Sequence, residues 1–255
     1  MKEWLYGRNA VYETLRAGRR QFFRLRLAEG VEEHGRLRDI LLLASKFELP
    51  VERVTRKSLD VFGSGHQGVL VEASGYSYGD LPGILSLAKQ RGEAPFVLIL
   101  DVLQDPQNLG TLLRTAEAVG VHGVLLPFKH TATVTPAVVN SSSGATEYLQ
   151  IAQMNLAQAI RRLKESNVWV IGLKEAADAQ PMSRVRLDGP LALVVGSEGS
   201  GMRALVSKSC DGLMSIPMRG RIESLNAAVA GSIALYFAWQ RRGFSSKSID
   251  DNTKS

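Results

Sequence analysis

The fold is decided by a stretch in which five apolar residues run directly into a glycine-rich turn, LALVVGSEGSGM at residues 191–202. A continuous apolar run of this length is typical of a strand that is buried on both faces of a parallel sheet. The turn precedes a helical pattern at residues 203–210. Because backbone approaches ligands most easily between such a strand and a helix, the stretch predicts an α/β fold with a binding loop. A plain strand-to-helix turn is the alternative. Glu198 within the turn disfavours phosphate and favours a cationic or neutral polar ligand.

A second glycine-rich segment, GSGHQG at residues 63–68, fits the G-x-G-x-x-G pattern of dinucleotide-binding loops. That pattern binds phosphates only where it follows a strand and opens a helix. Here it runs into an apolar strand at residues 69–72 instead. We therefore interpret the segment as a flexible turn, in which a ligand contact by His66 is weakly supported.

The alternation of apolar strands and helices extends to both sides of the 191–202 stretch. The expected strands lie at 96–100, 121–126, 168–173, 191–195 and 212–216. The expected helices lie at 109–119, 135–140, 155–165, 203–210 and 225–241. Continuous apolar strands separated by helices predict a parallel sheet that is covered on both faces.

Glycine, proline and polar residues between positions 75 and 94 indicate a linker around a short helix. We therefore expect an N-terminal domain at 1–78, a linker at 79–94, a C-terminal domain at 95–243 and a disordered tail at 244–255. The N-terminal pattern predicts a small α/β sandwich. Its expected helices lie at 9–16 and 36–47, and its expected strands at 22–27, 51–54 and 68–73.

The composition of the 255-residue chain is that of a soluble globular protein, with 45% hydrophobic residues and a single Cys. One Cys excludes an internal disulfide framework, and the four His residues show no metal-ligand spacing with it, so no metal is predicted. The first residues contain no apolar leader, and no apolar run approaches the roughly 20 residues that span a bilayer. We expect a cytoplasmic protein with no membrane contact.

The net charge of +6 comes from 31 Lys and Arg residues against 25 Asp and Glu residues. Basic residues are concentrated in the first 26 positions, where seven Lys and Arg residues face two Glu residues. Such a run is most often a solvated helix face, and it could also bind RNA phosphates. In the second case, neutralising Arg19, Arg20, Arg24 and Arg26 should weaken RNA binding and its salt dependence.

Three segments of the C-terminal domain resemble the three motifs of the SpoU (TrmH-like) branch of the SPOUT RNA 2′-O-methyltransferases. They are LDVLQDPQNLG at 100–110 continuing through LRTAEA at 113–118, VGSEGSGM at 195–202, and IPMRGRIESLNAAVA at 216–230. YGRNAV at 6–11 and HQGV at 66–69 resemble the family's L30e-type RNA-binding module. Gln107 stands where His is common, and Ala227 and Ala228 replace bulkier or hydroxylated residues. These departures bear on substrate preference and leave the predicted catalytic residues unchanged.

The resemblance implies a deep trefoil knot in the C-terminal parallel-sheet domain, an exception to the usual absence of knots. It also implies S-adenosylmethionine (SAM) as methyl donor, held by Gly196, Gly201, Ile216 and Leu225. A homodimer through the C-terminal domain, with each site completed across the interface, is implied as well. The domain order is similar to that of RlmB-type enzymes, which methylate a guanosine ribose in 23S rRNA.

Five residues carry the chemistry that the resemblance implies. These residues are Asn108, Arg114, Glu198, Ser224 and Asn226. Family accounts make the arginine a general base, but a guanidinium stays protonated at neutral pH, so we favour binding of the phosphate beside the target ribose. Asn108 could simply cap its helix, and Glu198 could orient Arg114 or form a structural salt bridge. Ser224 and Asn226 could hold the ligand or the ribose, and they could also cap the helix at 225–241.

Residues expected to bind RNA are basic and lie in the N-terminal domain or beside the third motif. They are Arg8, Arg19, Arg20, Arg24, Arg26, Arg219 and Arg221. For the last two, solvated loop positions are equally plausible. The alternatives to a 23S rRNA enzyme are a transfer RNA methyltransferase, an antibiotic-resistance rRNA methyltransferase and a non-catalytic RNA-binding protein of the same fold.

Overall fold

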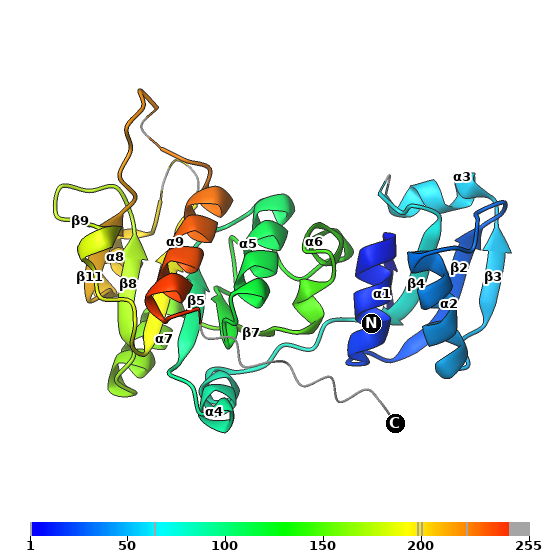
Figure 1. The fold of residues 1–255 in the computed structure, drawn as a ribbon, viewed down its shortest axis with the longest axis horizontal. Coiled ribbons are helices and arrows are strands. Elements are labelled where there is room, and N and C mark those ends of the chain that lie inside the picture. Colours follow the sequence, from blue (N-terminus) through cyan, green and yellow to red (C-terminus); the bar gives the residue numbers. More distant parts are fainter. Residues whose placement is uncertain (1, 64, 198, 200, 223, 245–255) are drawn as a thin grey trace.

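The structure is a computed structural model that describes residues 2–63, 65–197, 199, 201–222 and 224–244. Two sheets organise the chain, a four-stranded sheet near the N-terminus and a seven-stranded sheet after it. Figure 1 shows the two units side by side along the long axis of the molecule, with α1 on the side of the N-terminal unit that faces α6.

The N-terminal sheet has the strand order β1-β4-β2-β3, in which only β2 and β3 run parallel. Its strands are β1 (Lys2–Tyr6), β2 (Phe22–Ala28), β3 (Val51–Val54) and β4 (Val69–Ser74). Its helices are α1 (Arg8–Ala17), α2 (Arg36–Lys46), α3 (Arg56–Leu59) and the 3₁₀ turn η1 (Asp60–Phe62). Leu25 and Val71 pack in one cluster with residues of α1 and α2, whereas Leu70 packs in another with Leu59. Helices therefore cover both faces, and the predicted elements of this unit are confirmed.

Strand β1 was not predicted, because its sequence, KEWLY, begins with two charged residues and buries only Leu5 fully. It lies at the edge of the sheet and pairs with β4 alone. An edge strand carries few apolar residues, so the periodicity that identifies a buried strand is weak here.

The C-terminal sheet is parallel throughout, with the strand order β7-β6-β5-β10-β8-β11-β9. Its strands are β5 (Phe96–Leu100), β6 (Gly123–Leu126), β7 (Gln150–Gln153), β8 (Trp169–Leu173), β9 (Gln180–Pro181), β10 (Leu191–Val195) and β11 (Gly212–Ser215). The chain proceeds outward from β5 to β7 and then crosses to the other side of β5, where β10 is inserted next to it. The predicted parallel sheet is confirmed, while the short strands β7 and β9 were not predicted.

Successive residues of the central strands point to opposite faces of this sheet, as the pleat requires. Leu98 and Leu193 pack with residues of α5 and α9, while Ile99 and Val194 pack with residues of α4, α7 and α8. The helices are α4 (Leu81–Arg91), α5 (Pro106–Ala118), α6 (Pro136–Ser141), α7 (Leu156–Glu165), α8 (Ala204–Ser209) and α9 (Ala227–Arg241). This unit also contains the 3₁₀ turns η2 (Ala145–Glu147) and η3 (Met182–Arg184). Both faces are thus covered, which explains why β5 and β10 are apolar at every position.

The segment expected to link the domains packs on the C-terminal sheet. Gly79 donates a backbone hydrogen bond to the carbonyl of Ile151 at 2.9 Å, and α4 follows directly. Leu81 and Ile84 of α4 are buried with Val97 and Ile99. Helix α4 therefore belongs to the layer that covers one face of the seven-stranded sheet.

Among the described residues, no helix is long and apolar enough to cross a membrane. The trefoil knot stays a prediction. The expected disordered tail begins one residue before the part of the chain, 245–255, that lies outside the described residues.

Candidate active site

A cavity of about 570 Å³ opens at the carboxyl ends of β8, β10 and β11. Its lining includes Gly196 and Gly201 after β10, Ile216 after β11, and Ser224, Leu225 and Asn226 before α9. In an open α/β sheet, ligands bind outside the carboxyl ends of the strands where the chain changes direction across the sheet. Since β10 is inserted between β5 and β8, this cavity lies at that position. The structure thus brings together all four residues expected to hold the cofactor.

The glycine-rich turn after β10 closes on itself through backbone hydrogen bonds. The amide of Ser197 donates to the carbonyl of Gly201 at 3.1 Å, and the amide of Gly201 donates back at 3.0 Å. Gly196 is buried beneath this turn, and a Cβ at its position would lie 2.2 Å from the carbonyl carbon of Gly201. Only glycine leaves room for this backbone contact. Glu198, a predicted catalytic residue, lies outside the described residues.

Asn226 joins the third sequence motif to the first. Its Nδ2 donates a hydrogen bond to Oδ1 of Asn108 at 3.0 Å, from the start of α9 to the first turn of α5. Its Oδ1 accepts from the amides of Ala228 and Val229, so Asn226 also caps α9. The capping role and the contact at the cavity are therefore both fulfilled by one side chain.

Asn108 does not cap α5, so this alternative to its functional role is wrong. The N-cap is Asp105, whose carboxylate accepts from the amides of Gln107 at 3.0 Å and Asn108 at 3.3 Å. Pro106 follows at the first helical position, where its missing N–H costs nothing. The Asp-Pro pair is a stronger start signal than an asparagine two residues later, and this leaves the Asn108 side chain available for Asn226.

Asp101 is a residue of the site that the sequence reasoning did not single out. Its side chain is fully buried at the end of β5, and its carboxylate accepts from the backbone amide of Arg203 at 2.7 Å and from Nε of Arg203 at 2.8 Å. Arg203 directly follows the glycine-rich turn, so this ion pair fixes the far end of the turn to β5. The signal was an acidic residue at the end of an otherwise apolar strand.

Arg114 does not line the cavity. It lies six residues after Asn108 on α5, about 9 Å further along the helix axis, and its side chain is exposed. Its Nη1 donates to Oγ of Ser143, in the loop after α6, at 3.2 Å. On another side of α5, Oγ1 of Thr115 lies 2.9 Å from Oγ of Ser232 in α9. The helix therefore presents Asn108 toward α9 and Arg114 toward the loop after α6.

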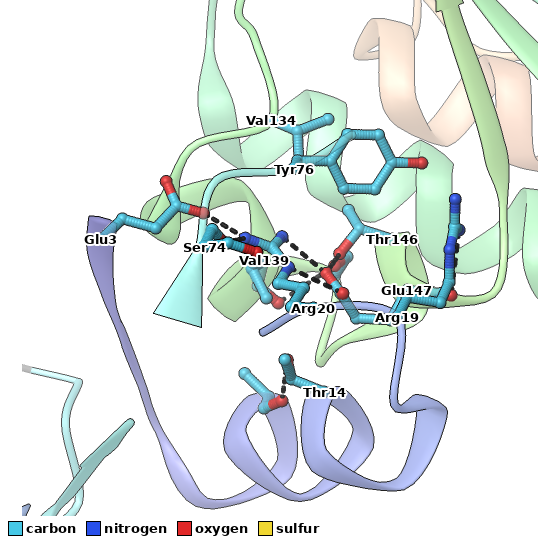
Figure 2. A network of polar contacts seen from close by, with 12 residues as sticks. Glu3, Thr14, Arg19, Arg20, Ser74, Tyr76, Val134, Val139, Thr146 and Glu147 are labelled. Carbon is cyan, nitrogen blue, oxygen red and sulfur yellow. Dashed lines mark hydrogen bonds and ion pairs between the residues drawn. The ribbon is translucent and has the colours of Figure 1, made fainter. Parts of the chain in front are cut away.

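Arg20 was expected to bind RNA, but its side chain is buried between the two units (Figure 2). Its Nε and Nη2 donate to the two carboxylate oxygens of Glu147 at 2.8 and 2.7 Å, and its Nη1 donates to Glu3 and to the carbonyl of Ser74. Burial alone would lower the pKa of Arg20, and the hydrogen bonds and charges of Glu147 and Glu3 raise it overall. A guanidinium held in this way has no donor directed toward solvent, so the expectation for Arg20 is corrected to an interdomain ion pair.

Other basic residues of the N-terminal run are partly neutralised by carboxylates. Arg24 pairs with Glu52 and Glu72, and Arg26 pairs with Glu52 at 2.8 Å. Both guanidinium groups also lie over the ring of Trp4. Charge counting along the first 26 residues could not reveal these partners, because Glu52 and Glu72 come from β3 and β4.

The remaining predicted RNA contacts differ in their surroundings. Nη1 of Arg19 donates to the backbone carbonyls of Glu147 and Leu149, at 3.1 and 2.8 Å. Arg8 contacts Gln67 through its amide and its Nε. Arg219 and Arg221 are exposed in the segment between β11 and α9, whose neighbouring residues line the cavity.

In the GSGHQG segment, residues 65–68 form a turn before β4 and do not open a helix, and His66 is buried in this turn. Nδ1 of His66 accepts from the amide of Gly68 at 2.9 Å, and Nε2 lies 2.9 Å from the carboxylate of Asp60. His66 therefore stabilises the turn. Across the described ranges, no group of three His, Cys, Asp or Glu side chains is placed to hold a metal ion.

Two family models match the chain. Residues 95–236 match the SpoU rRNA Methylase family, and residues 4–79 match the model described as RNA 2′-O ribose methyltransferase substrate binding. YacO of Bacillus subtilis (strain 168), named as a TrmH family tRNA/rRNA methyltransferase, is 40% identical over 245 residues, covering 94% of this chain and 96% of that protein. A Staphylococcus aureus (strain MSSA476) protein named in the same way is 38% identical over 240 residues, covering 93% and 96%.

The fold is also similar to solved structures. The SpoU methyltransferase AviRb from Streptomyces viridochromogenes, solved in complex with AdoMet, superposes with a TM-score of 0.79 at 22% sequence identity. The superposition covers 96% of this chain and 92% of AviRb. The parallel sheet, its cavity and the attached substrate-binding unit define an RNA 2′-O-ribose methyltransferase. The chain belongs to the SpoU rRNA methylase family.

Proposed function

We propose that this protein transfers a methyl group from SAM to the ribose 2′-hydroxyl of a guanosine in 23S rRNA. The proposal rests on one observation above all: the segments after β10, after β11 and before α9 line a single cavity, and Asn226 at its edge bonds to Asn108. These segments are the motifs through which the chain resembles RNA 2′-O-methyltransferases.

SAM is proposed to lie in this cavity, supplying the methyl group when it is bound. The lining suits such a molecule, because Gly196 and Gly201 have no side chain and contribute backbone alone, while Ile216 and Leu225 are apolar. Gly196 permits the turn to fold closely over β10, which leaves the backbone of the turn to line the cavity. Ser224 and Asn226 supply neutral donors and acceptors that match hydroxyl groups. Glu198 is kept as a proposed catalytic residue for orienting Arg114 or the turn.

Arg114 is proposed to bind the phosphate next to the target ribose. A guanidinium is permanently protonated at neutral pH and therefore stabilises an alkoxide better than it removes a proton. Placing this charge where negative charge develops lowers the barrier without reorganisation. Asn108, bonded to Asn226, is proposed to orient the cavity edge toward the acceptor ribose.

A homodimer through α9 is proposed because this helix exposes an apolar face. Val229, Ile233 and Tyr236 are 46%, 40% and 47% exposed and lie four and three residues apart, hence on one side of the helix. A second copy of the chain is the occupant that buries this stripe, which continues toward the exposed Leu225 at the cavity. A site completed across such an interface also accommodates Arg114, which lies outside the lining of its own chain's cavity.

RNA capture is assigned to the N-terminal unit and to the segment before α9. Arg8, Arg19, Arg24 and Arg26 on the first, and Arg219 and Arg221 on the second, supply the cations. Of these, Arg219 and Arg221 are exposed and closest in sequence to the cavity-lining residues.

The test of the substrate is to incubate the protein with labelled SAM and, separately, with unmodified 23S rRNA and unmodified transfer RNA. The methylated nucleotide is then mapped by mass spectrometry. A 2′-O-methylguanosine in 23S rRNA supports the proposal. A methyl group in transfer RNA, or at another nucleoside in an antibiotic-binding rRNA loop, would show that this RNA is the substrate and that the proposed 23S rRNA guanosine is not. SAM binding without transfer to any RNA would favour a non-catalytic RNA-binding protein.

A further inference from the structure

The loop between α6 and η2 contacts Arg114 and is held by the N-terminal unit. Within the described ranges, Oγ of Ser143 is the only hydrogen-bond acceptor that the structure gives to the Arg114 side chain, at 3.2 Å. Ser143 lies two residues after the end of α6. Just before it, Ser141 packs so closely on α5 that a Cβ on Gly110 would lie 1.9 Å from its Oγ. The loop therefore packs directly on the helix that carries Arg114.

The backbone of Ser143 has a conformation that the surrounding structure imposes. Its φ of 55° is in the left-handed region, which a serine rarely adopts. Its amide donates to the carbonyl of Asn140 at 2.9 Å, and the next amide, that of Gly144, donates to Val139 at 2.8 Å. An unfavourable backbone conformation that is fixed from both sides is frequent at functional sites. Here it directs the hydroxyl toward Arg114.

The opposite side of the same loop is docked on the N-terminal unit. Nδ2 of Asn140 donates to the carbonyl of Tyr6 at 3.0 Å, and a Cβ on Gly144 would lie 2.6 Å from Cβ of Glu13. Tyr148 donates to the carboxylate of Glu13 at 2.7 Å. Glu147 receives the buried Arg20, as Figure 2 shows. Residues 140–148 thus contact the substrate-binding unit on one side and Arg114 on the other.

We propose that Ser143 is a positioning residue that holds the guanidinium of Arg114, and that the docked N-terminal unit keeps Ser143 in place. The inference rests on the proposed role of Arg114. One hydrogen bond to Nη1 leaves the other guanidinium donors available for a phosphate. It also restricts a long, exposed side chain that would otherwise sample many rotamers, so the charge is in position when RNA binds.

The experiment compares full-length wild type with Ser143→Gly, Ser143→Asn and Arg114→Ala. Glycine removes the hydroxyl and tolerates the φ of 55°, while asparagine also tolerates this φ and restores an acceptor oxygen. Asn167→Gly is the matched control, because Asn167 has a φ of 57° in the turn before β8, away from Arg114. The measurements are kcat and KM on unmodified rRNA and transfer RNA, SAM affinity by calorimetry, the melting temperature, and the rate at which phenylglyoxal modifies Arg114.

We expect Ser143→Gly to lower kcat about tenfold and to accelerate Arg114 modification, with SAM affinity within twofold of wild type and an unchanged melting temperature. Ser143→Asn should recover much of the loss, and Arg114→Ala combined with Ser143→Gly should be no slower than Arg114→Ala alone. Wild-type kcat and modification rate in Ser143→Gly would overturn the inference, as would an equal effect in Asn167→Gly. If wild type methylates no RNA while the modification rates change as expected, the proposed function fails and the contact to Arg114 stands.

Discussion

Asn226 Nδ2 and Asn108 Oδ1, which are 118 positions apart in the sequence, meet at 3.0 Å where α5 and α9 begin. This hydrogen bond is a direct side-chain contact between the first and third sequence motifs. Nδ2 of Asn226 therefore contacts Asn108, while Oδ1 of the same side chain caps α9. The two roles can be separated by substitution.

Asn226→Asp should keep the helix cap and lose the donor to Asn108. We expect the melting temperature to stay close to that of wild type, since aspartate caps helices as well as asparagine does. Turnover should fall because a carboxylate cannot donate to Oδ1 of Asn108, which must turn its amide to keep a contact. Asn226→Ala should lose both functions and destabilise the protein by about 1 kcal/mol. Thermal unfolding and single-turnover methylation measure the two effects. Full activity in Asn226→Asp would show that the contact to Asn108 is not needed.

Arg219 and Arg221 should contribute more to RNA affinity than Arg24 and Arg26. Arg24 and Arg26 are already balanced by Glu52 and Glu72, so they neutralise fewer phosphates, and RNA binding through them releases fewer counterions. Replacing both Arg219 and Arg221 by Gln should reduce the slope of log affinity against log salt by about 0.7 for each lost phosphate contact. The slope is obtained by measuring RNA affinity by fluorescence anisotropy at salt concentrations from about 50 to about 300 mM. Equal slopes for the two double variants would argue against this ranking.

Glu147 and Arg20 should be strongly coupled in stability. Glu147→Leu leaves the buried Arg20 with Glu3 as its remaining carboxylate partner. The substitution alone should therefore cost about 3 kcal/mol, the low end for breaking a buried pair. The double variant Arg20→Met with Glu147→Leu should recover much of that loss, because an apolar pair needs no compensation.

The comparison needs a pair in solvent as its control. Arg186 and Asp188 are 2.9 Å apart with side chains 84% and 52% exposed, so Arg186→Ala should change the melting temperature little. Differential scanning calorimetry of all variants measures the coupling. Additive effects of the two interdomain substitutions would contradict a coupled pair.

His122 should make the protein less stable in mild acid. Burial lowers the pKa of His122, and its Nδ1 accepts from the amide of Phe96 at 3.0 Å, so Nε2 carries the proton toward Glu93. As the pH falls below the ordinary histidine value of about 6.5, the unfolded chain takes up a proton that the folded chain excludes. The free energy of unfolding therefore decreases with falling pH, by at most about 1.4 kcal/mol per pH unit.

His122→Asn keeps an acceptor for the amide of Phe96 and does not titrate. Between about pH 7.5 and 5.5, its melting temperature should fall less than that of wild type, by roughly 2 to 4 °C for each kcal/mol. Parallel pH profiles of the two proteins would exclude His122 as the source of acid sensitivity.

The sequence alone predicts the parallel sheet well, because β5, β8 and β10 are continuous apolar runs. Such a run predicts a buried strand even when its neighbours in the sheet are unknown. It also places Gly196, Ile216 and Leu225 together, although through the family resemblance and not through periodicity. Asn108 was one possible cap of α5, but the Asp105-Pro106 pair three residues earlier is the stronger start signal, and the helix uses it.

Pairing between distant side chains could not be predicted. Arg20 belongs to a basic run that suggests an RNA surface, but its partner Glu147 is 127 positions away. The neighbouring residues in the sequence do not distinguish a buried arginine from a solvated one when both lie in the same charged run. For the same reason the Asp101–Arg203 contact and the hydrogen bond from Arg114 to Ser143 required the folded chain.

Arg114 is proposed to assist methyl transfer to a ribose hydroxyl, and a single assay measures this role. Labelled SAM is incubated with unmodified RNA and either wild type, Arg114→Lys or Arg114→Ala, and 2′-O-methylated nucleosides are counted after digestion. We predict transfer by wild type, substantial activity in Arg114→Lys if only the charge matters, and a loss in Arg114→Ala of about 100-fold or more in kcat with SAM affinity unchanged. Wild-type turnover in Arg114→Ala, or no methylated ribose from wild type that binds SAM, would contradict it.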